Sequence, residues 1–512
     1  MKKKKTRLKN IIIVGSIITF FAIFTIIIIN IAQGKKVTPD GRIVDTAIIR
    51  LNTIPEEVTA YIDGVRVSQI ENRIEGIEVG EITLRLEKDG HSSWEKTITL
   101  EAGKVKNVYA QLYPMDLNFE QITNTNVDKI FFSRNADNVF YTVVDSETDS
   151  QIGLWKYKIT RNLLDFGSNE PERIATFDDE LISFLKNSSY SIQIAGDSNY
   201  VLLLNQDNGI SYIYNANRLN DLIKLNEKLG YLGDKYFWFK NSESLIIEKD
   251  NILFEYEVNS GRSNLIFFNP GQSPIFAVNG DTLYFYNQME GIISEYVNRD
   301  IQSIRLPKDF SIPKTINKMY TLAEFPEILL IESSEGLFYL DFSKNYSVLI
   351  DSEAVVEKIA NDGKSVLYKK NDEFITFNLE ESFDAQVYRT QTTKLSVDNS
   401  MIESIYYSSN STNLISLLVN DAGGIELWLM DSDGQNSIKL VNDETPIGLN
   451  SQITVNGTAL YILLDDSSTS EESPTENNQS NQDPTDNNAI EGNVTEPETV
   501  NRNIYKLNLE IK

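Results

Sequence analysis

The 512-residue chain contains no cysteine and a single histidine, His91. The absence of cysteine excludes disulfide bonds, a thiolate nucleophile and every cysteine-ligated zinc or iron–sulfur site. One histidine also excludes metal cages built from several imidazoles, so any catalytic chemistry is left to carboxylates, lysine, tyrosine or this one ring. The sequence contains no catalytic constellation, and we predict no catalytic, cofactor-binding or metal-binding residue.

Basic residues are also scarce. The 47 lysines and arginines face 74 aspartates and glutamates, which gives a formal charge of −27. Phosphate backbones require a basic surface, and the only dense basic run covers residues 2–9. We therefore expect no nucleic-acid partner. The 41% of apolar residues suffices for a large core, and the length allows two to four domains of about 150 residues.

The N-terminus has the pattern of a membrane anchor. Residues 1–10 carry six positive charges, and residues 11–32 are almost entirely apolar over about 33 Å of helix. This predicts a cytoplasmic stub, a transmembrane helix, and export of everything beyond it. A cleaved signal peptide is the alternative, because Ala32-Gln33-Gly34 resembles a cleavage site, although signal sequences have shorter apolar regions. Residues 33–45, with Pro39 and Gly41, are predicted to be a linker.

Residues 46–114 alternate between apolar and polar positions, with turn signals between the alternating runs. A hairpin is predicted over 60–67, where Asp63-Gly64 supplies the positive φ angles of a tight turn. Further strands are expected around Ile82–Leu86, Trp94–Leu100 and Val108–Leu112. The pattern predicts a small all-β domain of about 70 residues.

These residues resemble the PEGA domain, a small extracytoplasmic β module. The resemblance implies a surface module and not an enzyme. Pro55-Glu56-Glu57-Val58 keeps only the first two residues of the tetrad that names the family, and His91 stands where an aromatic residue is usual. The matching features are the strand leading into Pro55, Tyr61-Ile62-Asp63-Gly64, Val79-Gly80, Asp89-Gly90 followed by Trp94, and Leu112-Tyr113-Pro114.

His91 has two interpretations. Beside Ser92 and Ser93 it could form half of a hydrolytic dyad, but no third partner of a triad is nearby in the sequence. The favoured interpretation is that the imidazole replaces an aromatic ring that packs on Trp94.

A repeating unit follows residue 114: a strand, a small turn, a very apolar strand, a polar turn, an aromatic strand and a weaker fourth strand. Repetition of this kind identifies the architecture. Eight segments read as the third strand of the unit: 153–157, 210–214, 252–256, 292–296, 336–340, 373–377, 425–429 and 503–507.

The spacing of these copies is about 45 residues once residues 465–500 are set aside, and four-stranded propeller blades have this length. We therefore predict an all-β chain in which residues 115–512 form a β-propeller, with eight blades favoured and seven as the alternative. The last copy lacks a fourth strand, whereas residues 117–120 form an unassigned strand before the first copy. We expect this strand to close the ring and cover the exposed edges.

Several copies carry a turn between their first and second strands that resembles the TolB-type, WD40-like propeller repeat, where Ser-Pro-Asp-Gly-Lys precedes an apolar strand. The resemblance covers most of residues 127–445 and supports the fold more than an activity. We expect the polar residues of these turns to satisfy local backbone groups. The turns are 133–138, 195–199, 240–244, 360–364 and 408–413.

Three further segments were tested for function. Asp431-Ser432-Asp433-Gly434 has the alternating carboxylates of a calcium loop but lacks the bidentate glutamate, so calcium is disfavoured. Gly423-Gly424 belongs to a hairpin and not to a nucleotide-binding loop. Residues 465–500 carry ten acidic residues and no basic ones, which predicts a disordered insertion within the last blade.

The leading hypothesis is a non-enzymatic, single-pass cell-envelope protein whose propeller binds a protein or polysaccharide outside the membrane. Two alternatives stay open. One is a carbohydrate-active enzyme that uses two carboxylates in the propeller channel, and the other is a TolB-like accessory of envelope assembly. Beyond the six N-terminal cations, 41 basic residues face 74 acidic ones, so the acidity belongs to the part predicted to be exported.

Overall fold

A computed structural model describes most of the chain. The residues described are 15–21, 24–25, 34–37, 41–115, 118–134, 136–146, 148, 150–159, 170–187, 189–207, 209–322, 325–360, 362–381, 388–395, 402–409, 411–419, 425–441, 447–453, 459–465 and 502–509. The chain divides into two compact units, one comprising Met1–Leu117 with Leu509–Lys512 and the other comprising Asn118–Asn508.

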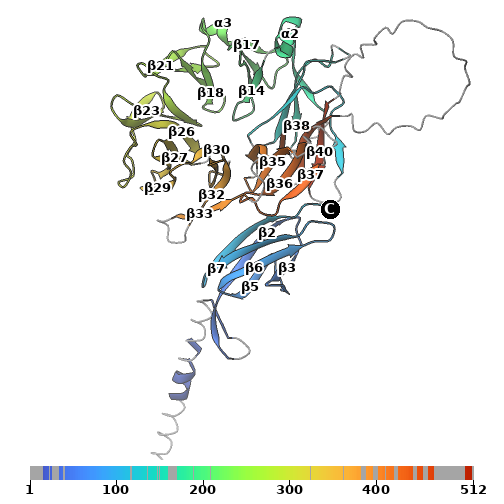
Figure 1. The fold of residues 1–512 in the computed structure, drawn as a ribbon, viewed down its shortest axis with the longest axis vertical. Coiled ribbons are helices and arrows are strands. Elements are labelled where there is room, and N and C mark those ends of the chain that lie inside the picture. Colours follow the sequence, from blue (N-terminus) through green and yellow to red (C-terminus); the bar gives the residue numbers. More distant parts are fainter. Residues whose placement is uncertain are drawn as a thin grey trace, which may run out of the picture. The chain divides into compact units, whose positions relative to one another are not determined.

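The first unit contains two four-stranded sheets (Figure 1). In one, β2 pairs with β1 and β5 and, in parallel, with β8; in the other the order is β4-β3-β6-β7. The strands are β1 (Lys35–Val37), β2 (Ile43–Ile54), β3 (Thr59–Ile62), β4 (Val65–Arg66), β5 (Arg73–Glu78), β6 (Gly80–Glu87), β7 (Trp94–Leu100) and β8 (Val105–Gln111).

The predicted alternation of this unit is confirmed. In β6, Ile82, Leu84 and Leu86 are buried on one face and pack in a single apolar cluster with residues from both sheets. The predicted hairpin joins β3 to β4, with φ of 48° at Asp63 and 79° at Gly64. The alternation shows which face is buried. The parallel pairing of β8 with β2 joins residues that are 57 positions apart, such as Ile48 and Val105, and it leaves no local signal in the sequence.

Part of the predicted linker is a strand, so that prediction was wrong at residues 35–37. β1 pairs antiparallel with the start of β2, from Lys35 opposite Asp45 to Val37 opposite Ile43. Gly41, which suggested irregular backbone, lies in the connection between these two strands, and Pro39 lies outside the described residues.

The second unit contains eight four-stranded antiparallel sheets in its described residues, seven of them built from consecutive strands. The first four sheets are β10 (Lys129–Phe132), β11 (Asn138–Val143), β12 (Gly153–Lys158), β13 (Glu172–Thr176); β14 (Tyr190–Ile194), β15 (Tyr200–Asn205), β16 (Ser211–Asn215), β17 (Leu222–Lys224); β18 (Lys235–Phe239), β19 (Ser244–Lys249), β20 (Ile252–Glu257), β21 (Ser263–Phe268); and β22 (Ile275–Asn279), β23 (Thr282–Asn287), β24 (Ile292–Val297), β25 (Asp300–Ser303).

The other four follow the same plan. They are β26 (Ile316–Leu322), β27 (Phe325–Ser333), β28 (Gly336–Asp341), β29 (Tyr346–Asp351); β30 (Val355–Ile359), β31 (Ser365–Lys370), β32 (Glu373–Glu381), β33 (Tyr388–Lys394); β34 (Ile402–Tyr407), β35 (Asn413–Val419), β36 (Ile425–Asp431), β37 (Ile438–Val441); and β38 (Ile447–Ile453), β39 (Ala459–Asp465), β40 (Arg502–Asn508), β9 (Phe119–Gln121).

The sheets form a ring, as Figure 1 shows. Apolar clusters join successive sheets, and the first strands of neighbouring sheets approach one another, including β10 of the first sheet and β38 of the eighth. The first strand of each sheet is thus the innermost. This is the architecture of a β-propeller, and we call the sheets blades 1 to 8 in chain order.

The N-terminal strand closes the ring, as predicted. In β9, Phe119 lies opposite Leu507 of β40 and Gln121 lies opposite Tyr505. An apolar cluster containing Tyr141 of blade 1 and Tyr461 of blade 8 fills the junction. The eighth blade therefore takes strands from both ends of the unit, which leaves no gap between first and last blades.

All eight segments predicted as third strands lie in the third strand of a blade. Their aromatic residues pack between blades, as expected: Tyr157, Tyr256 and Tyr339 are no more than 5% exposed. Two short helices in the connections after blades 1 and 2, α2 (Asp179–Asn187) and α3 (Leu225–Leu229), were not predicted. α2 buries Leu181 and Leu185 between blades 1 and 2.

The turns between first and second strands have the predicted structural role. In four of them a backbone N–H donates to the carbonyl three residues earlier, from Ala136, Ser198, Gly363 and Ser411, and each of these residues has a positive φ. Asp197 and Asp362 each accept a bond from a backbone N–H two residues ahead. The polar residues of these turns thus satisfy local backbone groups.

Two predicted segments lie mostly outside the described residues. Of the predicted transmembrane helix at 11–32, helical backbone is described at 15–21 and 24–25. Over the described part of the chain, no helix has the length and apolar character needed to cross a membrane. The stub at 1–10 and the acidic insertion from residue 466 to residue 500 also lie outside the described residues.

Candidate functional site

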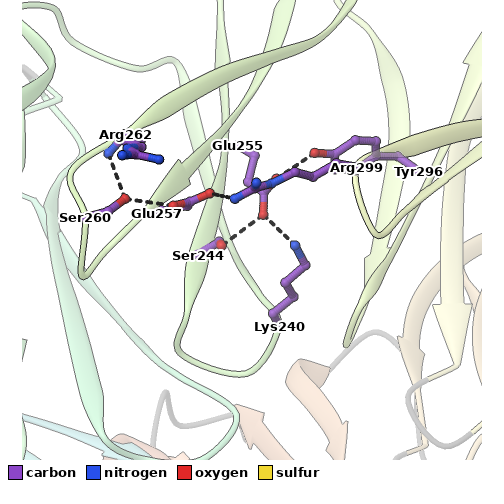
Figure 2. Close-up of polar contacts among 8 residues, drawn as sticks. All are labelled: Lys240, Ser244, Glu255, Glu257, Ser260, Arg262, Tyr296 and Arg299. Carbon is purple, nitrogen blue, oxygen red and sulfur yellow. Dashed lines mark hydrogen bonds and ion pairs between the residues drawn. The ribbon is translucent and has the colours of Figure 1, made fainter.

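A network of charged and hydroxyl side chains lies at the junction of blades 3 and 4 (Figure 2). It is carried by the start of β19 and the end of β20 in blade 3, the end of β24 in blade 4, and the turns that follow strands β18, β20 and β24. We call it the Glu255 network, and its members are Lys240, Ser244, Glu255, Glu257, Ser260, Arg262, Tyr296 and Arg299.

Glu255 is the centre of the network and is 1% exposed. One carboxylate oxygen accepts bonds from Lys240 Nζ at 2.7 Å and Ser244 Oγ at 3.0 Å. The other accepts a bond from Tyr296 Oη at 2.6 Å. Burial alone would raise the pKa of Glu255, but the bonds from Lys240 and Tyr296 outweigh it and hold the pKa below its usual value.

Backbone geometry aims Lys240 at this carboxylate. Lys240 follows the last residue of β18 and has a φ of 51°, in the left-handed region. Its backbone N–H donates to the carbonyl of Gly280, in the corresponding turn of blade 4, at 2.8 Å. One residue therefore contacts blade 4 through its backbone and Glu255 of blade 3 through its side chain.

Tyr296 completes the junction from blade 4. It is 4% exposed, and its ring stacks on that of Phe239, with 6.2 Å between the ring centroids. Burial and the bond to Glu255 raise the pKa of Tyr296 far above its usual value. The phenol is thus a fixed donor that ties the third strand of blade 4 to the third strand of blade 3.

The network continues to the surface through Glu257. Its carboxylate pairs with Arg299, in the turn after β24, and accepts a bond from Ser260 Oγ at 2.7 Å. The bond from Ser260 and the charge of Arg299 lower the pKa of Glu257. Arg299 is 60% exposed, and Arg262 contributes its backbone N–H, which lies 3.3 Å from Ser260 Oγ.

Glu255 and Glu257 are two residues apart on one strand, so they share a face and their Cα atoms are about 6.6 Å apart. Glycoside hydrolysis uses a pair of carboxyl groups that are about 5–10 Å apart, measured between the carboxyl groups themselves. One member of such a pair must hold a proton at working pH, which requires a raised pKa. Both pKa values are lowered here, so the pair is suited to holding two blades together and not to acid catalysis.

Blade 3 has a second buried carboxylate, which lies opposite the start of β18. Glu248 of β19 is 3% exposed and is bonded to Lys235 Nζ at 2.9 Å and to Ser273 Oγ. Ser273 lies in the connection from blade 3 to blade 4. Buried acids in this blade are thus matched by donors from the neighbouring connections.

The residues tested from the sequence are not brought together into a catalytic site. His91 is 6% exposed; its backbone N–H donates to Lys88 O, and its Nδ1 lies 3.0 Å from Asp89 O. Ser92 Oγ accepts a bond from Tyr113 N–H, and within the described residues no hydrogen bond joins His91 to either neighbouring serine. Packing of His91 on Trp94 stays a prediction.

The calcium-like turn also has a structural role. Asp431 accepts a bond from Asn436 Nδ2 at 2.8 Å, and Asp433 accepts one from the backbone N–H of Gln435 at 3.2 Å. Over the residues the structure describes, no group of three or more histidine, aspartate or glutamate side chains could hold a metal ion. Gly423-Gly424 lies outside the described residues.

Sequence reasoning missed the Glu255 network. A weak signal was present, because Glu255 occupies a position of β20 that alternation assigns to a polar face, yet the third strands of a propeller are covered on both faces. A charged residue in such a strand requires a partner. The partners come from another turn and another blade, and no local pattern identifies them.

The first unit has a clear relative among known families. Residues 46–116 match the PEGA domain. The match extends two residues beyond the segment singled out from the sequence, and it covers the two-sheet unit from β2 to β8. We refer to this segment as the PEGA domain below. No curated protein matches the chain.

Solved structures resemble the chain only weakly. The WD40 domain of SCAP from fission yeast is 11% identical, covers 77% of this chain and 94% of its own, and has a TM-score of 0.42. An oligogalacturonate lyase from Vibrio parahaemolyticus is 10% identical, with coverages of 68% and 94% and a TM-score of 0.38. A putative TolB from Agrobacterium tumefaciens is 12% identical, with coverages of 40% and 73% and a TM-score of 0.25. The propeller assignment rests on the sheet topology given above.

Proposed function

We propose that this chain is a single-pass cell-envelope protein that displays its PEGA domain and propeller outside the membrane. The propeller binds a protein or polysaccharide partner and catalyses no reaction. Support for the location comes from six cations before the apolar run of residues 11–32 and two, Lys35 and Lys36, directly after it. Support for binding comes from a rigid ring whose turns and inner strands offer a broad surface.

One observation supports the proposal that the propeller catalyses no reaction. The carboxylates of Glu255 and Glu257 are each tied to a cation and a hydroxyl group, and the pKa of each is lowered. Neither carboxylate carries a proton at neutral pH, so neither serves as a general acid. The network buries the charge of Glu255, and the bonds to Lys240 and Tyr296 offset this cost through a defined contact between blades.

The enzyme alternative has one observation in its favour. Glu357 of β30 and Glu403 of β34 are both exposed, and they lie on neighbouring innermost strands of blades 6 and 7. This is where a pair of carboxylates facing the propeller axis would have to lie. Hydrolysis of a polysaccharide by the purified full-length chain, abolished by Glu357→Gln or Glu403→Gln, would establish it.

The binding proposal is tested by photocrosslinking in the native envelope. A photoreactive phenylalanine analogue replaces Phe237, an exposed residue of an innermost strand, or Leu265, which is 64% exposed on the outermost strand of the same blade. Intact cells are irradiated, and the adducts are separated before and after digestion by external proteinase K. We expect an adduct from position 237 and none from position 265, with the propeller accessible to the external protease.

The nature of the adduct then identifies the class of partner. A partner that proteinase K degrades is a protein and is identified by mass spectrometry, whereas one that resists digestion is a polysaccharide. Absence of any adduct at position 237, or a propeller protected from external protease, would contradict the proposed function.

A further inference from the structure

The innermost strands of blades 1 to 5 differ in charge from the rest of the propeller. Residues 118–508 contain 59 acidic and 29 basic residues, a net charge of −30. The only charged residues in β10, β14, β18, β22 and β26 are Lys129, Lys235 and Lys318. We call these five strands the inner arc. A strongly acidic unit thus places three positive charges and no negative one on the five strands of the inner arc.

The three lysines lie at one level of the ring. Lys129 is opposite Thr142, Lys235 is opposite Glu248, and Lys318 is opposite Glu332. Each of these partners is the penultimate residue of the second strand of its blade. The lysines therefore recur at the same height on blades 1, 3 and 5, and a single ligand bound across the arc can meet more than one of them.

The three lysines differ in the interactions that their side chains make within the protein. Lys129 Nζ lies 3.8 Å from the ring centroid of Tyr190, and Lys235 is paired with the buried Glu248. Lys318 is exposed, and within the described residues it makes no ion pair or hydrogen bond. Glu332 opposite it is 7% exposed and is instead bonded to Tyr320 Oη at 2.9 Å. Lys318 is therefore the cation most available to a ligand.

Exposed apolar side chains lie between these lysines. Phe237 of β18 is 38% exposed and packs edge-to-face on Phe276 of β22, with 5.1 Å between the ring centroids. Val278 of β22 is half-buried and packs in the same apolar cluster as Phe276. Removing a partly exposed aromatic ring from water is favourable, so a partner that covers these rings binds with a lower free energy.

We propose that the inner arc binds an acidic segment of a protein partner, with its carboxylates at the lysines and an apolar or aromatic side chain on Phe237 and Phe276. This rests on the proposed binding function and narrows its partner class. Charge complementarity selects an anionic ligand. The exposed aromatic pair, with the aliphatic Val278 packed in the same cluster as Phe276, favours a peptide with apolar side chains over a polysaccharide.

Blade 6 supplies a matched control. Lys358 of β30 is also an exposed lysine of an innermost strand without an ion pair or hydrogen bond among the described residues. It lies outside the inner arc, on a strand that also carries the exposed Glu357. Lys318→Gln and Lys358→Gln remove the same charge from comparable positions, and only the first lies on the proposed site.

The experiment measures binding of defined polymers to the purified full-length chain by fluorescence anisotropy. The probes are a labelled glutamate–tyrosine copolymer, polyglutamate, polygalacturonate and, as the opposite charge, polylysine. We expect the copolymer to bind most tightly and to weaken as salt is raised. Lys318→Gln should weaken copolymer binding about threefold, Phe237→Ala about tenfold, and Lys358→Gln not measurably.

Equal effects of Lys318→Gln and Lys358→Gln would overturn the proposal, as would tighter binding of polygalacturonate than of the copolymer. The thermal unfolding midpoint of each variant shows whether it is folded, and Phe237→Leu replaces Phe237→Ala if the latter is not. Failure here leaves the proposed function intact if the crosslink at position 237 still forms. Absence of that crosslink would contradict the proposed binding function itself.

Discussion

Two lysines, one in blade 3 and one in blade 5, show how the propeller uses positive charge in two ways. Lys240 follows β18, is 20% exposed at its side chain, and is bound to a glutamate that is 1% exposed. Lys318 lies on β26, is exposed, and has no ion pair or hydrogen bond among the described residues. The first lysine neutralises a charge that the fold has already buried, whereas the second is available to neutralise a charge that arrives with a ligand.

The difference follows from where each residue lies in a blade. Third strands are covered by blades on both sides, so a carboxylate such as Glu255 must find donors within the protein. Innermost strands have one edge towards the axis. There, water solvates a charged side chain until a ligand displaces the water. The strand on which a charged residue lies therefore indicates whether it has a structural or a binding role, even before a ligand is known.

Removing Lys240 should have the largest effect on stability. Lys240→Met keeps the length of the side chain but leaves Glu255 buried without its cation, which costs about 3–5 kcal/mol of unfolding free energy. The measurement is urea unfolding of the full-length chain, followed by tryptophan fluorescence. Copolymer binding by the folded variant should not change.

The control is Lys364→Met. Lys364 is exposed in the corresponding turn of blade 6, so its loss should change the unfolding free energy by about 0.5 kcal/mol or less. Equal unfolding midpoints for the two variants would show that Glu255 does not depend on its cation, and the contrast between the two lysines would no longer hold.

A smaller, pH-dependent loss is expected for Glu255→Gln. The amide gives up charge-assisted bonds from Lys240 and Tyr296, which costs about 2 kcal/mol at pH 7. Because the folded pKa of Glu255 is lowered, its contribution is complete above the unfolded pKa of about 4.3 and is lost as pH falls through the folded pKa. The difference between wild type and variant should therefore shrink as pH is lowered below about 4.

Unfolding curves at pH 7 and at about pH 3 test this expectation. Glu243→Gln, an exposed glutamate in the same turn, serves as the reference for general effects of charge. A difference between wild type and Glu255→Gln that stays constant across this pH range would mean that the carboxylate is not ionised in the folded protein.

The repeat could be predicted because it is local. Each third strand carries its own apolar and aromatic alternation, and each turn its own Asp, Asn or Gly, so eight blades and the closing strand near Phe119 follow from pattern alone. Helix α2 was missed because a nine-residue helix in a blade connection interrupts a pattern read only for strands.

The network could not be predicted because it is not local. Lys240, Glu255 and Tyr296 belong to a turn, a strand of the same blade and a strand of the next, and the hydrogen bonds among them depend on strand register and blade packing. The sequence shows that Glu255 is charged and lies on an apolar strand. Which donor neutralises it is decided only when the ring closes.

The smallest effect is expected at the surface end of the network. Arg299 pairs with Glu257, but the arginine is 60% exposed and the glutamate 20% exposed, so water and salt screen the pair. Arg299→Ala should lower the unfolding free energy by about 0.5 kcal/mol, and 1 M NaCl should remove most of that loss. The same urea titration used for Lys240→Met, run at low and high salt, measures it. A loss as large as that of Lys240→Met would mean that the exposed pair holds the two blades together, and that burial does not decide which charges of this propeller are structural.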